Sequence, residues 1–209
     1  MNAIKPSRFL PIMLALAMTG PWTAVSALAR IDSAYTSLDS EKDCRLIDEA
    51  KEDEGGDWAE LLCTGYGDYP VYISYGDARD SVFFGYPPDG KPDSWESFGG
   101  FNAAGKTVEW RLEDGAPFAT ILRWSVNTIT SGGENRSIEV LVVEKVAQPD
   151  SHESCVVGYV VAPGNPGHNE QARALADEYA RSFTCWRDEP LVMEGSVPLP
   201  GPSRSKREN

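Results

Sequence analysis

The four cysteines constrain the fold of this chain more than any other feature of its sequence. They are Cys44, Cys63, Cys155 and Cys185, and all lie beyond the first 29 residues. An even number of cysteines in an exported chain predicts two disulfide bonds. Three pairings are possible, and we favour Cys44 with Cys63 and Cys155 with Cys185, because each bond then closes a local supersecondary unit. Each bond would stabilise the fold by roughly 2–4 kcal/mol.

The N-terminal segment has the three-part pattern of a cleavable export signal. Lys5 and Arg8 precede an apolar run over residues 9–18, and small residues at 27–29 suit a signal peptidase. The alternative, an uncleaved membrane anchor, is disfavoured because this run is about half of the ~20 residues that cross a bilayer. No cysteine directly follows the run, which argues against a lipoprotein. We expect cleavage before Arg30 and a periplasmic or secreted mature chain with no stable membrane anchor.

The expected mature chain is strongly acidic. The full chain has 19 Lys and Arg residues against 32 Asp and Glu residues, a net charge of −13, and loss of the two basic signal residues shifts this to −15. Such a field repels nucleic acid and anionic lipid, so we expect neither as a partner. By analogy with periplasmic lysozyme inhibitors, the charge and the compartment favour a basic protein partner. Solubility alone is the simpler explanation of the charge.

Alternating hydrophobicity makes the middle of the chain β-rich. Val108, Trp110 and Leu112 face away from the polar residues between them, which predicts a half-buried strand. Asp-Gly and Gly-Gly turns separate the following runs, so we expect an antiparallel meander. The other strands of the meander are expected at 118–126, 138–146 and 155–162. Shorter strands are expected earlier in the chain, at 44–47, 58–64, 71–75 and 81–85.

One segment has helical spacing instead. Its apolar residues are Ala172, Leu175, Ala176, Tyr179 and Phe183. We expect a helix capped by Asn165, running to about Thr184 and lying on one face of the sheet. The prediction is an α+β fold: mainly an antiparallel β meander with one C-terminal amphipathic helix packed on the sheet and stapled by disulfides.

The domain organisation follows from composition. Residues 1–29 form the signal peptide, residues 30–194 are long enough for a single β-rich globular domain, and residues 195–209 are expected to be a disordered tail. The tail is rich in proline and serine and ends in basic residues, a composition that cannot build a core.

Three runs carry a resemblance to known proteins. They are TVEWRL at 107–112, LVVEKV at 141–146 and CVVGY at 155–159, the last leading into the expected helix. In pattern the chain resembles a group of exported, periplasmic alphaproteobacterial proteins of unknown function, over most of the mature part. The group has no assigned activity, so no functional residue is carried over. The resemblance implies a bacterial periplasm, which makes the glycosylation sequon at 135–137 a coincidence.

No motif in the sequence carries specific chemistry. Cysteine spacing is wrong for zinc or a redox centre, so we predict no metal site and no cofactor. His168 near the helix start could act as a general base, but a surface or capping role is favoured, and His152 in a polar turn has less claim. The nucleophile elbow motif is absent, and bridged cysteines cannot act as nucleophiles. We predict no catalytic residues and favour a protein that is not an enzyme.

Two local clusters offer weaker alternatives. Six acidic residues between Asp48 and Asp57 surround Gly55-Gly56, which makes a cation site conceivable, but the spacing is not that of an EF-hand and a solvated hairpin loop is favoured. Tyrosines recur every three residues from Tyr66 to Tyr75, with Trp95 further on. A strand shows one face every two residues, so these rings cannot form one stacking platform.

These observations favour a non-enzymatic binding or interaction protein of the cell envelope. The alternative is a periplasmic hydrolase acting on an envelope polymer. A deep polar pocket with convergent histidine or carboxylate groups would favour the hydrolase.

Overall fold

The computed structural model describes residues 30–51, 55–129 and 132–206, which form twelve β-strands, one α-helix and one short 3-10 turn. The predicted signal peptide lies outside these residues. The helix α1 covers His168–Tyr179 and the 3-10 turn η1 covers Pro88–Gly90. The strands are β1 (Ile31–Ser37), β2 (Cys44–Glu49), β3 (Trp58–Cys63), β4 (Val71–Gly76), β5 (Arg79–Phe84), β6 (Ser94–Phe98), β7 (Asn102–Glu113), β8 (Ala116–Ile129), β9 (Asn135–Lys145), β10 (Cys155–Val161), β11 (Leu191–Met193) and β12 (Pro202–Lys206).

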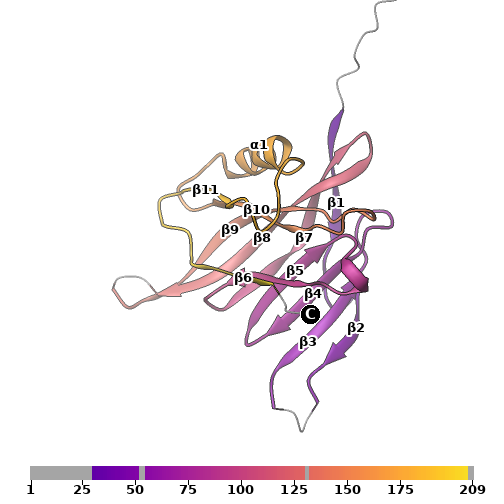
Figure 1. The fold of residues 1–209 in the computed structure, drawn as a ribbon. Coiled ribbons are helices and arrows are strands. Elements are labelled where there is room, and N and C mark those ends of the chain that lie inside the picture. The colour runs from indigo at the N-terminus through magenta and orange to yellow at the C-terminus, as the bar shows by residue number, and fades with distance from the viewer. Residues whose placement is uncertain (1–29, 52–54, 130–131, 207–209) are drawn as a thin grey trace, which may run out of the picture.

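The strands form two sheets and a ribbon. The larger sheet has the order β1-β7-β8-β9-β10-β11, and only its β10–β11 pair is parallel. Strands β2 to β5 form a second antiparallel sheet in chain order, and β6 pairs with β12. Four consecutive strands, β7 to β10, are therefore neighbours in chain order (Figure 1). This arrangement confirms the predicted antiparallel meander.

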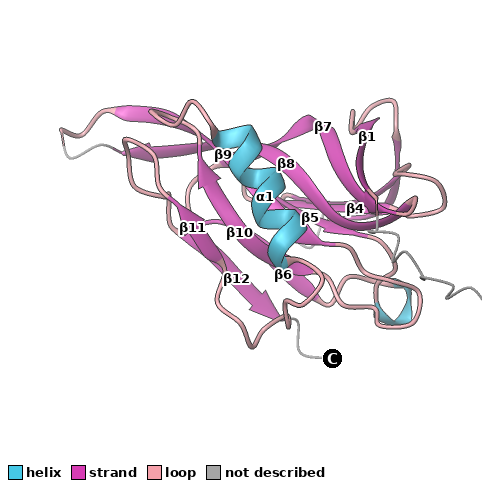
Figure 2. Ribbon diagram, turned by 90° about the horizontal axis from the view of Figure 1, so that it is seen from above, coloured by secondary structure: helices cyan, strands magenta, loops and turns pink. Residues whose placement is uncertain are grey.

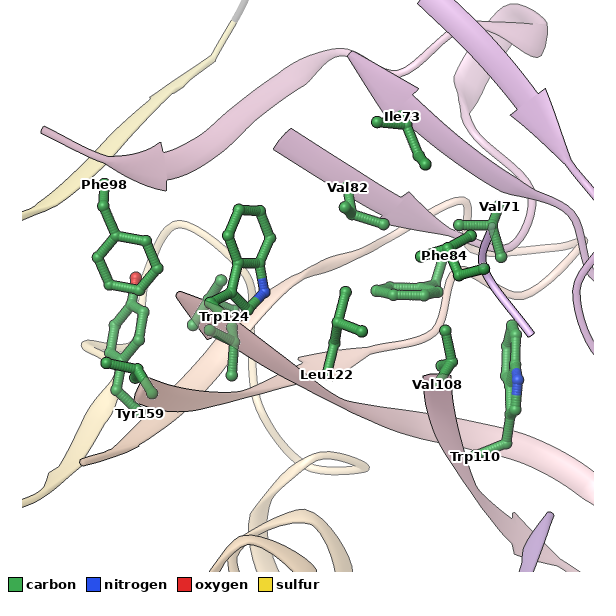
Figure 3. Packing of buried hydrophobic residues seen from close by; sticks show 14 of the residues in the cluster. Val71, Ile73, Val82, Phe84, Phe98, Val108, Trp110, Leu122, Trp124 and Tyr159 are labelled. Carbon is green, nitrogen blue, oxygen red and sulfur yellow. The ribbon is translucent and has the colours of Figure 1, made fainter. Parts of the chain in front are cut away.

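The main core lies between the larger sheet and the layer formed by β4, β5 and β6. Trp110 and Trp124 of the larger sheet are at most 2% exposed. Phe84 meets Trp110 edge-on with ring centroids 5.6 Å apart, and Phe98 meets Trp124 in the same way at 5.8 Å. Figure 3 shows the side chains of the two layers pointing toward one another, with Phe98 above Tyr159 at one end of the core. Burying such apolar area stabilises the fold by roughly 25 cal/mol per Å².

Helix α1 covers the opposite face of the larger sheet (Figure 2). Ala172, Leu175 and Ala176 are its buried residues, and with buried side chains of β8, β9 and β10 they form a second apolar cluster. Gly158 of β10 allows the helix to approach, because a Cβ at that position would lie only 2.7 Å from Leu175 Cδ1. The layers are thus helix, larger sheet and smaller sheet. The protein has an α+β fold, as the sequence predicts.

Both predicted disulfide bonds are present. Cys44 and Cys63 face each other across the β2–β3 hairpin, while Cys155 at the start of β10 is bonded to Cys185 beyond α1. The preferred local pairing is therefore confirmed. Two disulfides indicate an oxidising, non-cytoplasmic compartment. Among the residues described, no helix is long and apolar enough to cross a membrane.

The helix is shorter than the sequence pattern predicts. It begins at His168 with Gly167 at the N-cap, and it ends at Tyr179 rather than near Thr184. Asn165 does not cap it, because the Asn165 side chain donates to Gln171 while the Asn165 carbonyl accepts from the His168 N–H in a preceding turn. Tyr179, expected in the apolar stripe, is 38% exposed.

The second half of strand β7, residues 108–112, is buried on both faces rather than one. Glu109 and Arg111, expected on a solvent-facing side, are only 9% and 8% exposed, and both are hydrogen-bonded to side chains of α1. Charged residues can occupy such a position only when they are paired. Their partners on α1 are described below.

The end of the chain also differs from expectation. Residues 202–206 of the predicted disordered tail form β12, which pairs antiparallel with β6. Composition alone suggested disorder, but two features stabilise the strand: main-chain pairing along β6 and a buried partner, Glu96, for the Arg204 guanidinium. The prediction was wrong for this part of the tail.

Candidate functional site

A pocket of about 370 Å³ opens between α1 and strands β7 and β8. The buried side chains of Ile121 and Leu141 form its apolar part. Lys106 of β7, Arg123 of β8 and Arg173 of α1 provide cationic groups around it. Apolar walls with a few convergent polar groups are typical of small-molecule sites. We call this hollow the basic pocket.

A backbone irregularity makes room for the basic pocket. Ala104 pairs with Trp124 and Val108 pairs with Leu122, so residues 105–107 of β7 lie opposite Arg123 alone. The extra residues bulge out of the sheet and carry Lys106 to the rim. Glycine is required at position 105, because a Cβ there would lie 2.6 Å from the Arg123 carbonyl oxygen.

Glu109 anchors the helix side of the pocket. Its carboxylate accepts from Arg173 Nε at 2.7 Å, from Arg173 Nη2 at 3.1 Å and from the Ser33 hydroxyl at 2.6 Å. Burial opposes ionisation of Glu109, but these hydrogen bonds and the charge of Arg173 together hold the pKa of Glu109 below its ordinary value. Arg173 also donates to the Tyr35 hydroxyl at 3.3 Å. Arg173 is therefore held in a fixed orientation over β7.

A second ion pair lies beside the first and deeper under the helix. Arg111 of β7 donates from Nε and Nη2 to the two carboxylate oxygens of Asp177, at 2.8 and 2.6 Å. Arg111 Nη1 donates to the Ser33 hydroxyl and lies 3.7 Å from the Glu109 carboxylate. Two bidentate pairs thus join α1 to β7. Bidentate geometry fixes the relative orientation of the paired side chains and also strengthens each ion pair. These ion pairs hold α1 against β7 and so fix the helix side of the basic pocket.

Arg123 connects the sheet to the start of α1. Its Nη1 donates to Glu139 at 3.0 Å, and its Nη2 donates to Asn169 Oδ1 at 3.1 Å and lies 3.2 Å from His168 Nε2. His168 Nδ1 lies 2.6 Å from the Asn165 carbonyl oxygen, which can only accept. This network places the proton of a neutral His168 ring on Nδ1 and leaves Nε2 as the acceptor for Arg123.

More cations than carboxylates line the basic pocket. Lys106, Arg123 and Arg173 line it with the single carboxylate of Glu109, and each cation is paired with a carboxylate, Asp39, Glu139 and Glu109 respectively. The carboxylate, Glu109, is turned to Arg173, whereas the side chains of Arg123 and Arg173 are about one-third exposed and that of Lys106 is 74% exposed. A larger hollow of about 500 Å³ beside Cys44–Cys63 is lined by two cations and two carboxylates, so its charges balance. The basic pocket is therefore the better candidate for ligand binding.

The residues considered for catalysis form no hydrogen-bonded nucleophile–base pair among the described residues. His152 and Cys185 line the same hollow of about 420 Å³, but His152 Nδ1 lies 3.1 Å from the Tyr86 carbonyl oxygen and Cys185 is bridged, as are the other three cysteines. Within the described ranges, neither histidine ring hydrogen-bonds a serine hydroxyl or a carboxylate. The hydrogen bond between His168 Nδ1 and the Asn165 carbonyl oxygen, in the turn before α1, fits the surface or capping role favoured for His168.

The structure describes the two weaker clusters in part. The acidic stretch flanks the β2–β3 hairpin, with residues 52–54 outside the described part of the chain. No group of three or more His, Cys, Asp or Glu side chains that could hold a metal occurs among the described residues. The tyrosines contact different partners: Tyr66 lies on Trp110, Tyr69 on Tyr86 and Tyr72 on Phe83. They form no common platform.

Sequence reasoning missed the residues of the basic pocket. Arg123 and Arg173 were visible as single basic residues in an apolar strand and on a helix, and nothing in the sequence linked them to Lys106. The one available signal was Gly105 inside a strand pattern, which is typical of a bulge or a close backbone approach. Comparison with protein-family models, with curated protein sequences and with solved structures finds no match to this chain.

Proposed function

We propose that the protein is an exported, non-enzymatic binding protein of the cell envelope, and that its basic pocket takes a small anionic ligand. One observation carries this proposal: Lys106, Arg123 and Arg173 converge on an apolar hollow in an otherwise acidic chain. A cleft lined by one sign of charge concentrates ions of the opposite sign. The two disulfides support a non-cytoplasmic site of action, and the N-terminal pattern supports export.

The spare hydrogen-bond capacity of the cations fits a carboxylate or a phosphate. A guanidinium has five N–H groups and an ammonium has three. Lys106 uses its ammonium on Asp39 at 3.1 Å at the pocket rim, and Arg123 uses two of its three nitrogens on protein partners. Ile121 and Leu141 would contact the apolar body of the ligand, and Tyr35 offers an exposed ring beside it. A single anionic group on a ring or a short chain matches this arrangement.

The hydrolase alternative gains no support from this arrangement. Hydrolysis needs a nucleophile or a pair of acid and base groups in reach of one bond. Among serine, threonine and cysteine, only Thr107 occurs in the described pocket lining, no hydrogen bond to a base is found for it, and the pocket's carboxylate is paired with Arg173. The groups present can bind and orient an anion.

Thermal unfolding with added ligands tests the proposal. We expect inorganic phosphate or glucuronate at millimolar concentration to raise the Tm of the protein, and glucose at the same concentration to leave it unchanged, because only a ligand that binds the folded state stabilises it. Comparison of phosphate with glucuronate distinguishes the two anion classes. Binding should weaken as sodium chloride is added, because salt screens the attraction.

Two variants locate the binding site. Lys106→Gln and Arg123→Gln should each lose most of the shift, whereas Lys91→Gln, which removes an exposed cation outside the pocket, should retain it. The proposal is wrong if no anion shifts the Tm of the wild-type protein. It is also wrong if Lys91→Gln abolishes the shift as completely as Lys106→Gln does.

A further inference from the structure

The C-terminal strand β12 has one neighbouring strand, and the segment before it is attached to the fold through Val197 and Leu199, which pack against the main core, and through the Gly99 N–H, which donates to the Gly201 carbonyl. It pairs with β6 over its whole length, from Pro202 opposite Phe98 to Lys206 opposite Ser94. The preceding residues 194–201 contain no helix and no strand, and Ser203 to Lys206 are at least partly exposed. Figure 2 shows β12 as a separate strand that ends the described chain beside β6. The two strands form a two-stranded ribbon, in which an extended C-terminal segment supplies the only strand partner that β6 has among the described residues.

A buried carboxylate meets this strand at one position. Glu96 Oε1 accepts from Arg204 Nε at 2.6 Å, and the two side chains are only 5% and 17% exposed. The other oxygen, Glu96 Oε2, accepts from the Val156 N–H of β10 at 2.9 Å, so the carboxylate is fixed from the side of the sheet. A carboxylate this deeply buried is costly without a cation beside it. Arg204 of the strand paired with β6 supplies this cation.

A second cation is recognised two residues later. Lys206 Nζ lies 3.4 Å from Asp93, and it shares the ring of Trp186 with Arg204, at 6.0 and 5.0 Å from the ring centroid. Alternate residues of a strand point to the same side, so an Arg-x-Lys spacing presents both cations together. A hollow of about 420 Å³ borders Asp93, Trp186 and Lys206. Glu96, Asp93 and Trp186 together form a cradle that binds two cationic side chains, two residues apart, of one extended segment.

We propose that the β6 edge with this cradle is an acceptor site for an extended segment of a basic partner protein that carries arginine and lysine two residues apart. The chain's own C-terminal strand occupies the site and must leave before a partner enters. Its short tether gives it a local concentration in the millimolar range, so a partner competes best when the tail is weakened. This site is separate from the basic pocket and does not depend on an anionic ligand.

The test uses the full chain with its tail cations removed. In the double variant Arg204→Ser, Lys206→Ser the tail remains but cannot satisfy the cradle. We expect this variant to bind a fluorescent peptide of residues 200–206, Pro-Gly-Pro-Ser-Arg-Ser-Lys, in an anisotropy titration, and the wild-type chain to bind it at least about tenfold more weakly because its own tail competes. The same peptide with glutamine at both basic positions should lose at least about tenfold in affinity.

Matched changes in the protein locate the binding. Added to the double variant, Glu96→Gln should abolish peptide binding, and Glu41→Gln, an exposed glutamate elsewhere, should leave it unchanged. Equal binding of the basic and glutamine peptides overturns the proposal, as does no binding by a double variant whose near-UV circular dichroism is native. A mixed dimer of wild-type and double-variant chains, lost on Glu96→Gln, would identify a second copy as the donor of the segment and would contradict a foreign partner.

A second measurement applies if the double variant does not fold. A protease site placed at the exposed Pro198 of the wild-type chain allows the folded protein to be nicked, leaving the tail held by its pairing with β6 and by the cradle. We expect the nicked tail to exchange with added basic peptide and not with the glutamine peptide. A tail that neither dissociates nor exchanges over days overturns the proposal, because the site would then be a permanent part of the fold.

Discussion

Replacing Gly158 with alanine tests how closely α1 is seated on the larger sheet. A Cβ at this position would lie 2.7 Å from Leu175 Cδ1 and 2.7 Å from the Leu191 carbonyl oxygen. Both distances are too short for a carbon in van der Waals contact. Gly158 lies within β10 and outside the left-handed backbone region, so alanine suits its conformation and the cost is steric.

The expected cost follows from the two contacts. Overpacking a closely packed site costs roughly 1–3 kcal/mol, and each kcal/mol lowers the Tm by about 2–4 °C at this chain length. Gly201→Ala is the matched control, because nothing lies within 4 Å of a Cβ at that position. Urea unfolding followed by tryptophan fluorescence under oxidising conditions measures the difference in free energy.

A second substitution shows whether the helix is the cause. Leu175 is 1% exposed, so Leu175→Ala alone should cost about 2–5 kcal/mol. The double variant Gly158→Ala, Leu175→Ala should cost less than the sum of the two by about 1 kcal/mol, because one of the two clashes is gone. Strict additivity, or a Gly158→Ala variant as stable as the control, would refute the argument.

Three further results are expected. Burial, reinforced by the charge of Glu96, raises the pKa of Glu144 well above its ordinary value of 4.5. The contribution of Glu144 to stability is therefore fully present below pH 4.5 and is lost as the pH rises through the folded-state pKa. Urea unfolding at a series of pH values should show this loss of stability in the wild-type protein and a smaller loss in Glu144→Gln. Hydrogen exchange on the Cys155→Ser, Cys185→Ser double variant should show α1 losing more protection than β7 and β9, and equal loss would indicate one cooperative unit. N-terminal sequencing of exported protein should begin at or near Arg30, and a sequence starting at Met1 would contradict signal cleavage.

Much of the fold could be predicted because its signals are local. The period-two alternation around Trp110 and Trp124 identified the central strands, and the turns between them fixed an antiparallel order. The disulfide pairing followed from the same local units. These features depend on residues that are close together in the sequence, so the sequence of a single chain is enough to predict them.

The remaining features depend on contacts that are distant in sequence. Glu109 and Arg111 look like solvent-facing residues until α1 covers them, and the helix lies more than 50 residues away along the chain. The composition of the tail cannot predict strand β12, because Glu96, the partner of Arg204, lies 108 residues earlier in the chain. The basic pocket combines a bulge in β7 with side chains from β8 and α1. Long-range ion pairs of this kind leave no periodic trace in a sequence.

The position of β1 has a consequence for the order in which the chain folds. It is the first described strand, yet it pairs only with β7, and the Arg30 N–H hydrogen-bonds Asp114, 84 residues further on. In the export that we propose for this chain, N-terminus first, β1 emerges long before β7 and stays unpaired while β2 to β5 can already form their hairpins. Closing such a long loop costs entropy and slows folding. The larger sheet is therefore completed late, and until then β1 has an unpaired edge that can pair with another chain.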